Sequence, residues 1–249
     1  MIEIRGLSKR LGRSPVLEDL DLDIRTGETL VVLGPSGTGK SVLLKHIIGL
    51  MKPDAGSIRI DGEEIVGLPE KELNRVRMRF GMLFQGAALF DSMTVGENVG
   101  LAMREHARDM APAEVERRVR ERLEWVGLED AAAMKPASLS GGMRKRAGLA
   151  RALALDPEYI LYDEPTTGLD PITADVINQL ILDLQKRLHV TAVVVTHDIQ
   201  SAYAVADRIV LLYQGRMVFD GTVEETRHTD DPMVRQFIEG SSRGPIQPV

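Results

Sequence analysis

Apolar and polar residues alternate along the first part of the chain. The alternation runs through the segments Met1 to Arg5, Val16 to Ile24 and Ser57 to Gly62. A period of two is typical of strands that bury one face of a sheet and expose the other. We therefore predict an antiparallel β-subdomain at the N-terminus.

Four later segments are apolar without alternation. Such runs indicate strands buried on both faces, as in a parallel sheet covered by helices. The runs are Leu30 to Leu33, Phe80 to Phe84, Tyr159 to Tyr162 and Ala192 to Val195. Two further strands, Arg208 to Tyr213 and Arg216 to Phe219, flank the turn signal Gln214-Gly215 and predict a hairpin.

Helical spacing of apolar residues separates these strands. The predicted helices are Val42 to Leu50, Leu68 to Arg79, Pro112 to Val126, the end of Met134 to Leu155, Ala174 to Leu188 and Ser201 to Ala206. Within Pro112 to Val126, the i,i+4 pairs Glu114–Arg118 and Glu116–Arg120 favour a helix whose charges form a solvated face.

This order of segments predicts an α/β protein with a parallel sheet core. We expect a single domain over residues 1–222, with a helical subdomain at about residues 86–150. Residues 223–249 form a C-terminal tail with Val234, Phe237 and Ile238 at helical spacing. A frayed end is the default interpretation of this tail, and a docking segment is the alternative.

Composition narrows the class of protein. A net charge of −6 argues against bulk nucleic-acid binding, so no nucleic-acid partner is expected. The absence of cysteine rules out disulfides and thiolate metal sites. No leader or membrane-spanning stretch stands out, so we expect a chain that is soluble by itself and meets a membrane only through a partner.

The most informative motif follows the apolar run that ends at Leu33. It has the pattern G-x-x-x-x-G-K-S between a predicted strand and a predicted helix, which is the context of a phosphate-binding loop. Its glycines allow backbone N–H groups to surround phosphates, and its lysine and serine suit the phosphate charge and Mg²⁺. The alternative is a glycine-rich turn that only resembles the motif. The residues are Gly34, Pro35, Ser36, Gly37, Thr38, Gly39, Lys40, Ser41 and, at the start of the helix, Val42.

Polar residues follow three other predicted strands. Asp163 and Glu164 come after one strand, His197 after another, and Gln85 after a third. The carboxyl ends of parallel strands form the edge at which ligands bind in α/β sheets. We expect Asp163 to hold Mg²⁺ and Glu164 to accept a proton from an attacking water, with an acidic helix start as the alternative. His197 is predicted to contact a γ-phosphate, although a lone histidine is more often structural.

A second glycine-rich helix start lies at Leu139 to Arg144. Ser140 is a good N-cap, and Gly141 and Gly142 leave the first N–H groups of the helix open to an anion. An ordinary capped helix is the alternative interpretation. The chain thus has two candidate phosphate-binding helix starts far apart in sequence.

In this order, the motifs resemble those of the ATPase subunits of ABC transporters. The resemblance covers about residues 2–222 and includes Gly168-Leu169-Asp170. It implies a P-loop NTPase fold of the ABC type and a homodimer that binds ATP between the phosphate loop of one subunit and Ser140, Gly141 and Gly142 of the other. The implied function is ATP hydrolysis that powers a membrane permease.

The resemblance also assigns roles to single residues. Glu164 would be the catalytic base, His197 would contact the γ-phosphate, and Asp170 would couple the two sites. Ser41, Gln85 and Asp163 would serve Mg²⁺, and Gln85 would also act in catalysis. The segment after Gln85 would meet a coupling helix of the permease.

Two positions depart from the family pattern. Leu11 stands near the place where many members have an aromatic residue against adenine, and Leu11 and Val16 can offer the base only apolar contact. Met143 replaces the usual glutamine of the second motif and lacks its amide.

Met143 with Arg144-Lys145-Arg146, and the segment Phe84 to Val95, are similar to the Mla-type, Mce-associated ATPases of phospholipid trafficking. This resemblance implies lipid transport at the cytoplasmic face of the bacterial inner membrane. It further implies an Mce-domain lipid-binding protein and a small regulatory subunit as partners. An ABC importer or exporter of amino acids, metals or lipoproteins is the alternative, because cargo binds outside the ATP site. A non-transport ABC protein and an inactive scaffold fit the single cassette and the complete motif set less well.

Overall fold

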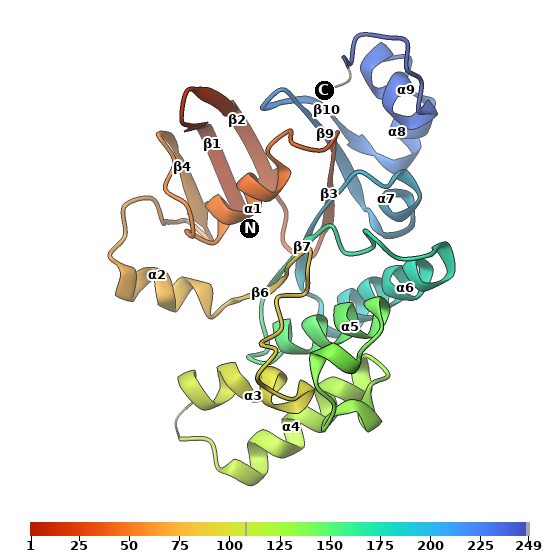
Figure 1. The fold of residues 1–249 in the computed structure, drawn as a ribbon. Helices are drawn as coiled ribbons and strands as arrows, with labels where there is room; N and C mark the ends of the chain where they lie inside the picture. The colour runs from red at the N-terminus through yellow and green to blue at the C-terminus, as the bar shows by residue number, and fades with distance from the viewer. Residues whose placement is uncertain (108, 248–249) are drawn as a thin grey trace. The chain divides into compact units, whose positions relative to one another are not determined.

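A computed structural model describes residues 1–107 and 109–247, which fold into two compact units. The first unit consists of Met1–Leu73 together with Thr191–Val249, and the second of Asn74–Val190. Figure 1 follows the chain from the first unit into the second and back. The chain therefore crosses from one unit to the other twice.

The N-terminal part of the first unit is an antiparallel sheet of four strands. Its order is β2 (Ser14–Ile24), β1 (Ile2–Leu11), β4 (Ala55–Ile60) and β5 (Glu63–Glu64). Ile2 pairs with Ile24 of β2 and with Ile60 of β4, so apolar residues of three strands share one face. The alternation in the sequence thus matches the burial, and the predicted antiparallel β-subdomain is confirmed.

The rest of the first unit surrounds a buried central strand. Strand β3 (Thr29–Leu33) runs parallel to β8 (Thr191–Thr196) on one side and to β9 (Arg208–Tyr213) on the other. Strand β10 (Arg216–Thr222) is antiparallel to β9. Gln214 and Gly215 turn this hairpin with φ of +47° and +76°, as a tight primed turn requires. The predicted hairpin is confirmed.

Short helices complete the first unit. They are α1 (Lys40–Ile47), α7 (Ile199–Val205), α8 (Val223–His228) and α9 (Pro232–Glu239), and α2 (Glu70–Arg77) spans the boundary between the units. The chain then folds back on α9. The Gln236 side chain donates to the carbonyl of Ile246 at 2.9 Å and accepts from its N–H at 2.6 Å. The tail is therefore folded as far as Gln247 rather than frayed.

The second unit contains two parallel strands and most of the helices. Strand β6 (Phe80–Leu83) pairs with β7 (Tyr159–Asp163), and the helices are α3 (Val95–His106), α4 (Pro112–Trp125), α5 (Gly141–Ala152) and α6 (Pro171–Leu188). Two 3₁₀ turns, Glu129–Ala131 and Pro136–Ser138, precede α5. The sequence analysis did not propose α3. Its signal was a capping box, in which Thr94 and Glu97 bond each other's backbone N–H groups.

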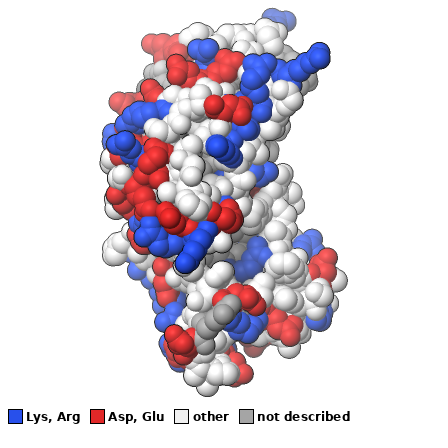
Figure 2. All heavy atoms as spheres, turned by 90° about the vertical axis from the view of Figure 1, so that its left-hand side faces the viewer, with Lys and Arg blue, Asp and Glu red and all other residues white. Residues whose placement is uncertain are grey.

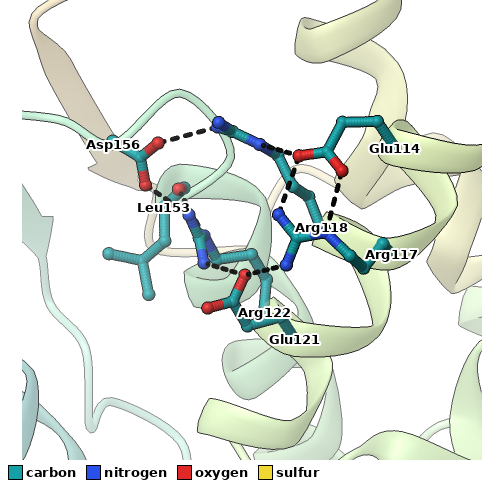
Figure 3. A network of polar contacts seen from close by, with 7 residues as sticks. All are labelled: Glu114, Arg117, Arg118, Glu121, Arg122, Leu153 and Asp156. Atoms are coloured by element: carbon teal, nitrogen blue, oxygen red, sulfur yellow. Dashed lines mark hydrogen bonds and ion pairs between the residues drawn. The ribbon is translucent and has the colours of Figure 1, made fainter. Parts of the chain in front are cut away.

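A network of charged side chains fastens α4 to the end of α5 (Figure 3). Arg118 bonds Glu114 at 3.1 Å and Asp156 at 2.8 Å. Arg122 is only 3% exposed; its Nε donates to the Leu153 carbonyl at 3.0 Å, and its Nη2 pairs with Asp156. The Glu114–Arg118 pair is thus confirmed. The prediction that the charges of α4 form only a solvated face is wrong, because Arg122 is buried.

The indole of Trp125 lies between two guanidinium groups. Arg122 of α4 and Arg187 of α6 approach the ring centroid to 3.9 Å and 4.3 Å. Cations over the face of an indole are attracted by its quadrupole. The contact therefore connects α4 to α6 as well as to α5.

Charges on the surface are mixed in sign. Figure 2 shows red and blue atoms side by side over much of the face that it presents. In the first unit, exposed pairs such as Arg5–Asp23 at 2.7 Å and Lys9–Asp54 at 2.9 Å join neighbouring strands and turns. Such exposed pairs add little to stability.

Replacing Arg122 with methionine tests the network of Figure 3. The variant keeps the apolar stem but leaves the Leu153 carbonyl and Asp156 without this donor. We expect the free energy of unfolding to fall by about 2 kcal/mol in urea titrations. Arg117→Met, which removes an exposed cation of the same helix, should leave the midpoint nearly unchanged. Equal midpoints for the two variants would contradict the assigned role of Arg122.

Candidate functional site

The predicted phosphate loop connects buried β3 to α1 and depends on close backbone packing. A Cβ at Gly34 would lie 2.3 Å from the Leu212 carbonyl oxygen, and one at Gly39 would lie 2.8 Å from that of Val16. Gly39 also has a φ of +101°, which side chains disfavour. Sequence pattern and backbone geometry therefore agree that glycine is required at both positions.

The Lys40 side chain folds back into the loop. Its Nζ donates to the carbonyls of Gly34 at 2.8 Å and Pro35 at 2.9 Å, and the residue is 5% exposed. The Thr38 hydroxyl also donates to the Pro35 carbonyl at 2.9 Å. The ammonium group is thus placed at the loop rather than in solvent, which suits a cation that meets phosphates.

Of the two residues predicted near adenine, Val16 is the one whose backbone packs on the loop. Its carbonyl oxygen borders both Gly39 and Gly215. Leu11 ends β1 with 47% of its surface exposed and pairs with Ser14 across the β1–β2 turn. Val16 therefore has a defined position beside the loop, whereas Leu11 lies at the exposed end of its strand.

His197 leaves the sheet at the same edge as the phosphate loop. In the parallel pair β3–β8, Leu33 is opposite Thr196, so Gly34 and His197 follow the carboxyl ends of neighbouring strands. His197 is exposed, and Asp198 after it caps α7 by accepting from Gln200 N–H at 3.0 Å. The loop and the histidine thus follow neighbouring strand ends within the first unit.

The second unit places Gln85 and the acidic pair at one strand edge. Leu83 of β6 is opposite Tyr162 of β7, so Gln85 and Asp163-Glu164 emerge from neighbouring parallel strands. Asp163 and Glu164 are 6% and 7% exposed, while Gln85 is exposed. The oxygens at this edge are hard donors of the kind that Mg²⁺ prefers.

Glu164 is held at two points. Its carboxylate accepts from the Thr167 hydroxyl at 2.9 Å, and its carbonyl accepts from Lys145 Nζ at 2.7 Å. Its φ of +50° is unusual for a residue with a side chain. Burial lowers the pKa of Lys145 to about 8, although the negative charges of Asp163 and Glu164 act to raise it. Lys145 could not be recognised as a partner of Glu164 from the sequence. The one feature that marked it was a cation four residues after Gly141, where the helix begins.

The second glycine motif forms the first turn of α5. Ser140 is the N-cap, and its Oγ accepts from the Met143 N–H at 3.2 Å, as predicted for a capping serine. A Cβ at Gly142 would lie 2.5 Å from the Thr173 side chain, and one at Gly141 would lie 3.3 Å from that of Leu169. The glycines therefore also allow close packing against the segment that leads into α6.

Asp170 caps α6. Its carboxylate accepts from the Thr173 hydroxyl at 2.6 Å and from the Thr173 and Ile172 N–H groups at 3.0 Å and 3.1 Å. The hydroxyl and the N–H of Thr173 lower the pKa of Asp170 below its ordinary value. Asp170 thus has a structural role that the sequence analysis did not predict.

The candidate residues fall into two groups. The first unit holds the phosphate loop, Val16 and His197, and the second holds Gln85, Asp163, Glu164, the start of α5 and Asp170. Each group contains charged or polar side chains at the carboxyl ends of parallel strands. The first is suited to an anion and the second to a cation and a water.

Comparisons with known proteins agree with this chemistry. The profile of the ABC transporter family matches residues 17–167. The chain is 47% identical to the probable ribonucleotide transport ATP-binding protein mkl of Mycobacterium leprae, over 98% of this chain and 70% of that protein. It is 42% identical to the intermembrane phospholipid transport system ATP-binding protein MlaF of Haemophilus influenzae, over 99% and 93%.

Solved structures support the fold. The dimeric ATP-binding cassette MJ0796, in a post-hydrolysis state bound to ADP and Pi, matches with a TM-score of 0.83 and 36% identity. The match covers 90% of this chain and 99% of that one. The fold predicted from the sequence, an α/β ABC ATPase cassette with an antiparallel sheet, parallel strands and helices, is therefore confirmed.

Gly39→Ala tests whether the loop geometry serves nucleotide binding. The added methyl group would meet the Val16 carbonyl and would be strained at a φ of +101°. We expect ATP affinity in equilibrium dialysis to fall about tenfold or more. Gly86→Ala is the matched control, since nothing lies within 4 Å of its added methyl group. Wild-type affinity in Gly39→Ala would argue against this loop as the phosphate site.

Proposed function

Because the chain belongs to the ABC transporter family and matches its ATP-binding subunits over nearly its whole length, we propose that it hydrolyses ATP to power a membrane permease that transports phospholipid. The observation that carries the ATPase assignment is the pair of strand edges, one with the phosphate loop and the other with Asp163 and Glu164. Both halves of a phosphoryl-transfer site are thereby present in one chain.

In this proposal the loop residues Gly34 to Ser41 bind the phosphates of ATP. Backbone N–H groups of the loop donate to phosphate oxygens, and Lys40 would exchange its carbonyl contacts for the β- and γ-phosphates. Leu11 and Val16 offer the adenine only apolar contact. Val42 follows in the first turn of α1.

Glu164 is the proposed base that accepts a proton from the attacking water. Its burial and the Thr167 hydrogen bond fix the carboxylate, which favours one orientation for that transfer. Ser41, Gln85 and Asp163 supply only oxygen ligands and so suit Mg²⁺, which would neutralise phosphate charge when bound. His197 is proposed to donate to the γ-phosphate.

We further propose that two copies of the chain share each nucleotide. Two solved structures of the MJ0796 cassette are dimeric, one of them bound to ADP and Pi. In such a pair, Ser140, Gly141, Gly142 and Met143 of one subunit would face the ATP on the phosphate loop of the other. The capped start of α5, with its unshielded N–H groups, supports this anion-binding role.

The proposed ATPase domain comprises residues 1–222, with its helical subdomain at about residues 86–150. Residues 223–249 are a C-terminal extension in this division. The folded contact between Gln236 and Ile246 supports a structured docking segment in the described part of the tail.

A groove in the second unit is the proposed site for the permease. It has a volume of about 500 Å³, is largely apolar, and lies along β6, the loop after Gln85, α3 and the end of α5. Phe90 is 51% exposed at this groove. A concave apolar surface with a few charged residues suits the apolar face of a partner helix. The lining residues include Met82, Phe84, Phe90, Leu101, Glu105 and Arg151.

Relatives guide the choice of cargo. The chain spans 91–93% of the MlaF proteins, named for intermembrane phospholipid transport, and 68–70% of the mkl proteins, named for ribonucleotide transport. The match along nearly the full length of MlaF favours phospholipid, with ribonucleotide as the second candidate. An Mce-domain protein and a small regulatory subunit are the proposed additional partners.

In the part of the chain that the structure describes, none of the helices is both long and apolar enough to cross a bilayer. We propose a peripheral position on the cytoplasmic face of the inner membrane, held by the permease.

Glu164→Gln separates ATP binding from hydrolysis. The amide cannot accept the proton of the attacking water, while the phosphate loop is unchanged. We expect ATP binding within about twofold of wild type and hydrolysis slower by about a hundredfold or more. ATP should also stabilise a dimer of this variant in size-exclusion chromatography. Hydrolysis at the wild-type rate would contradict the assignment of the base.

Phe90→Asp tests the groove. The exposed position should tolerate the substitution, whereas the charge would oppose an apolar partner helix. We expect the variant to lose its integral membrane subunits in detergent purification from native membranes. Met78→Asp, at a residue 40% exposed that does not line the groove, should retain them. Phospholipid extracted from the retained complex supports lipid cargo, whereas a ribonucleotide other than ATP or ADP without phospholipid supports the second candidate.

A further inference from the structure

Lys145 is a buried cation that the proposed chemistry does not use. Lys145 lies on α5, four residues after Gly141, and is 5% exposed. A buried ammonium group requires compensating partners, because removing it from water is costly. The partner that the structure gives it is the carbonyl oxygen of Glu164, at 2.7 Å from Nζ.

The backbone of Glu164 needs such a partner. Its φ of +50° lies in the left-handed region, which residues with a Cβ rarely adopt. The following Pro165 restricts Glu164 further, since a proline ring crowds the residue before it. An unfavoured conformation of this kind persists only where surrounding contacts determine it.

Lys145, on α5, provides one of the contacts that hold Glu164 in this conformation. The ammonium group donates to the Glu164 carbonyl, which also accepts from the Thr167 N–H at the longer distance of 3.4 Å. The Thr167 hydroxyl meanwhile bonds the Glu164 carboxylate at 2.9 Å. The main-chain carbonyl of Glu164 is thus bonded by Lys145 and Thr167, and its carboxylate is bonded by Thr167.

The start of α5 is attached to the same segment at two more places. Gly142 packs against Thr173, and Gly141 packs against Leu169. The turn that begins at Ser140 and the segment from Glu164 to Thr173 are therefore in close contact at three points. A displacement of the α5 start changes the surroundings of the Glu164 backbone directly.

We propose that Lys145 is a positioning residue for Glu164, which it holds in the left-handed conformation from the helix that begins at Ser140. The proposal rests on the function assigned above, in which Glu164 is the base. In the dimer, the start of α5 would face the nucleotide of the partner subunit, while Glu164 serves the nucleotide of its own subunit. Lys145 thereby connects the occupancy of one site with the orientation of the base in the other.

Lys145→Met is the primary test, because methionine fills a similar volume but donates no hydrogen bond. Measured with the full-length chain at high protein concentration, kcat should fall about tenfold or more, with ATP affinity within about twofold of wild type. Lys145→Arg, which keeps a cationic donor, should recover most of kcat. A decrease in affinity equal to that in kcat, or no recovery in Lys145→Arg, would overturn the proposal in favour of a merely structural role.

Arg146→Met is the matched control on the same helix. Arg146 also donates to carbonyls, those of Val126 at 2.9 Å and Gly127 at 2.7 Å, but it does not contact Glu164. Its kcat should stay within about threefold of wild type. An equal decrease in both variants would mean that any cation of α5 that donates to backbone carbonyls matters, and it would overturn the specific role of Lys145.

Combination with Glu164→Gln separates this inference from the function on which it rests. If Lys145 acts through the carboxylate, Lys145→Met should lower kcat strongly in the wild-type background and hardly at all beside Glu164→Gln. Full additivity of the two substitutions would overturn the positioning role. Wild-type hydrolysis by Glu164→Gln alone would instead refute the assignment of the base.

Discussion

Parallel strands that are buried along their length can expose polar groups only where they end. In this chain β3, β7 and β8 are buried throughout, and the chemistry-bearing residues follow their carboxyl ends. The backbone packing of the phosphate loop, the paired carboxyls and His197 all depend on this arrangement. The candidate site residues are thereby concentrated at the strand edges, while the remaining sequence determines how rigidly those edges are held.

The strands and the two glycine motifs could be predicted from sequence because their signals are local. Alternation defined β1 and β2, and the pattern from Gly34 to Ser41 identified the loop. Lys145 and Arg122 could not be predicted, because the carbonyls that they bind are 19 and 31 residues away. The helix α3 was missed although Thr94 and Glu97 formed a recognisable cap. Local sequence patterns therefore predict helices, strands and motifs, whereas the partners of buried charged side chains can be identified only from the tertiary structure.

Buried cations are the common means by which the second unit connects its helices. Arg122 bonds the end of α5, and Lys145 bonds the residue after β7. Both donate to backbone carbonyls, which cannot be lost by substitution of another side chain. Such contacts fix the main chain directly, and they constrain position more closely than apolar packing alone. Asp170, in contrast, is exposed and fixes the start of its own helix α6 by accepting from backbone N–H groups.

The stacking of Trp125 between Arg122 and Arg187 has a practical consequence. It is the single tryptophan of the sequence, so fluorescence excited at wavelengths that tyrosine does not absorb originates at the contact of α4 with α6. Two guanidinium groups so close to the ring make the emission wavelength of the indole sensitive to small changes in their distance. The protein therefore contains its own optical probe of helix rearrangement, without any need for a dye.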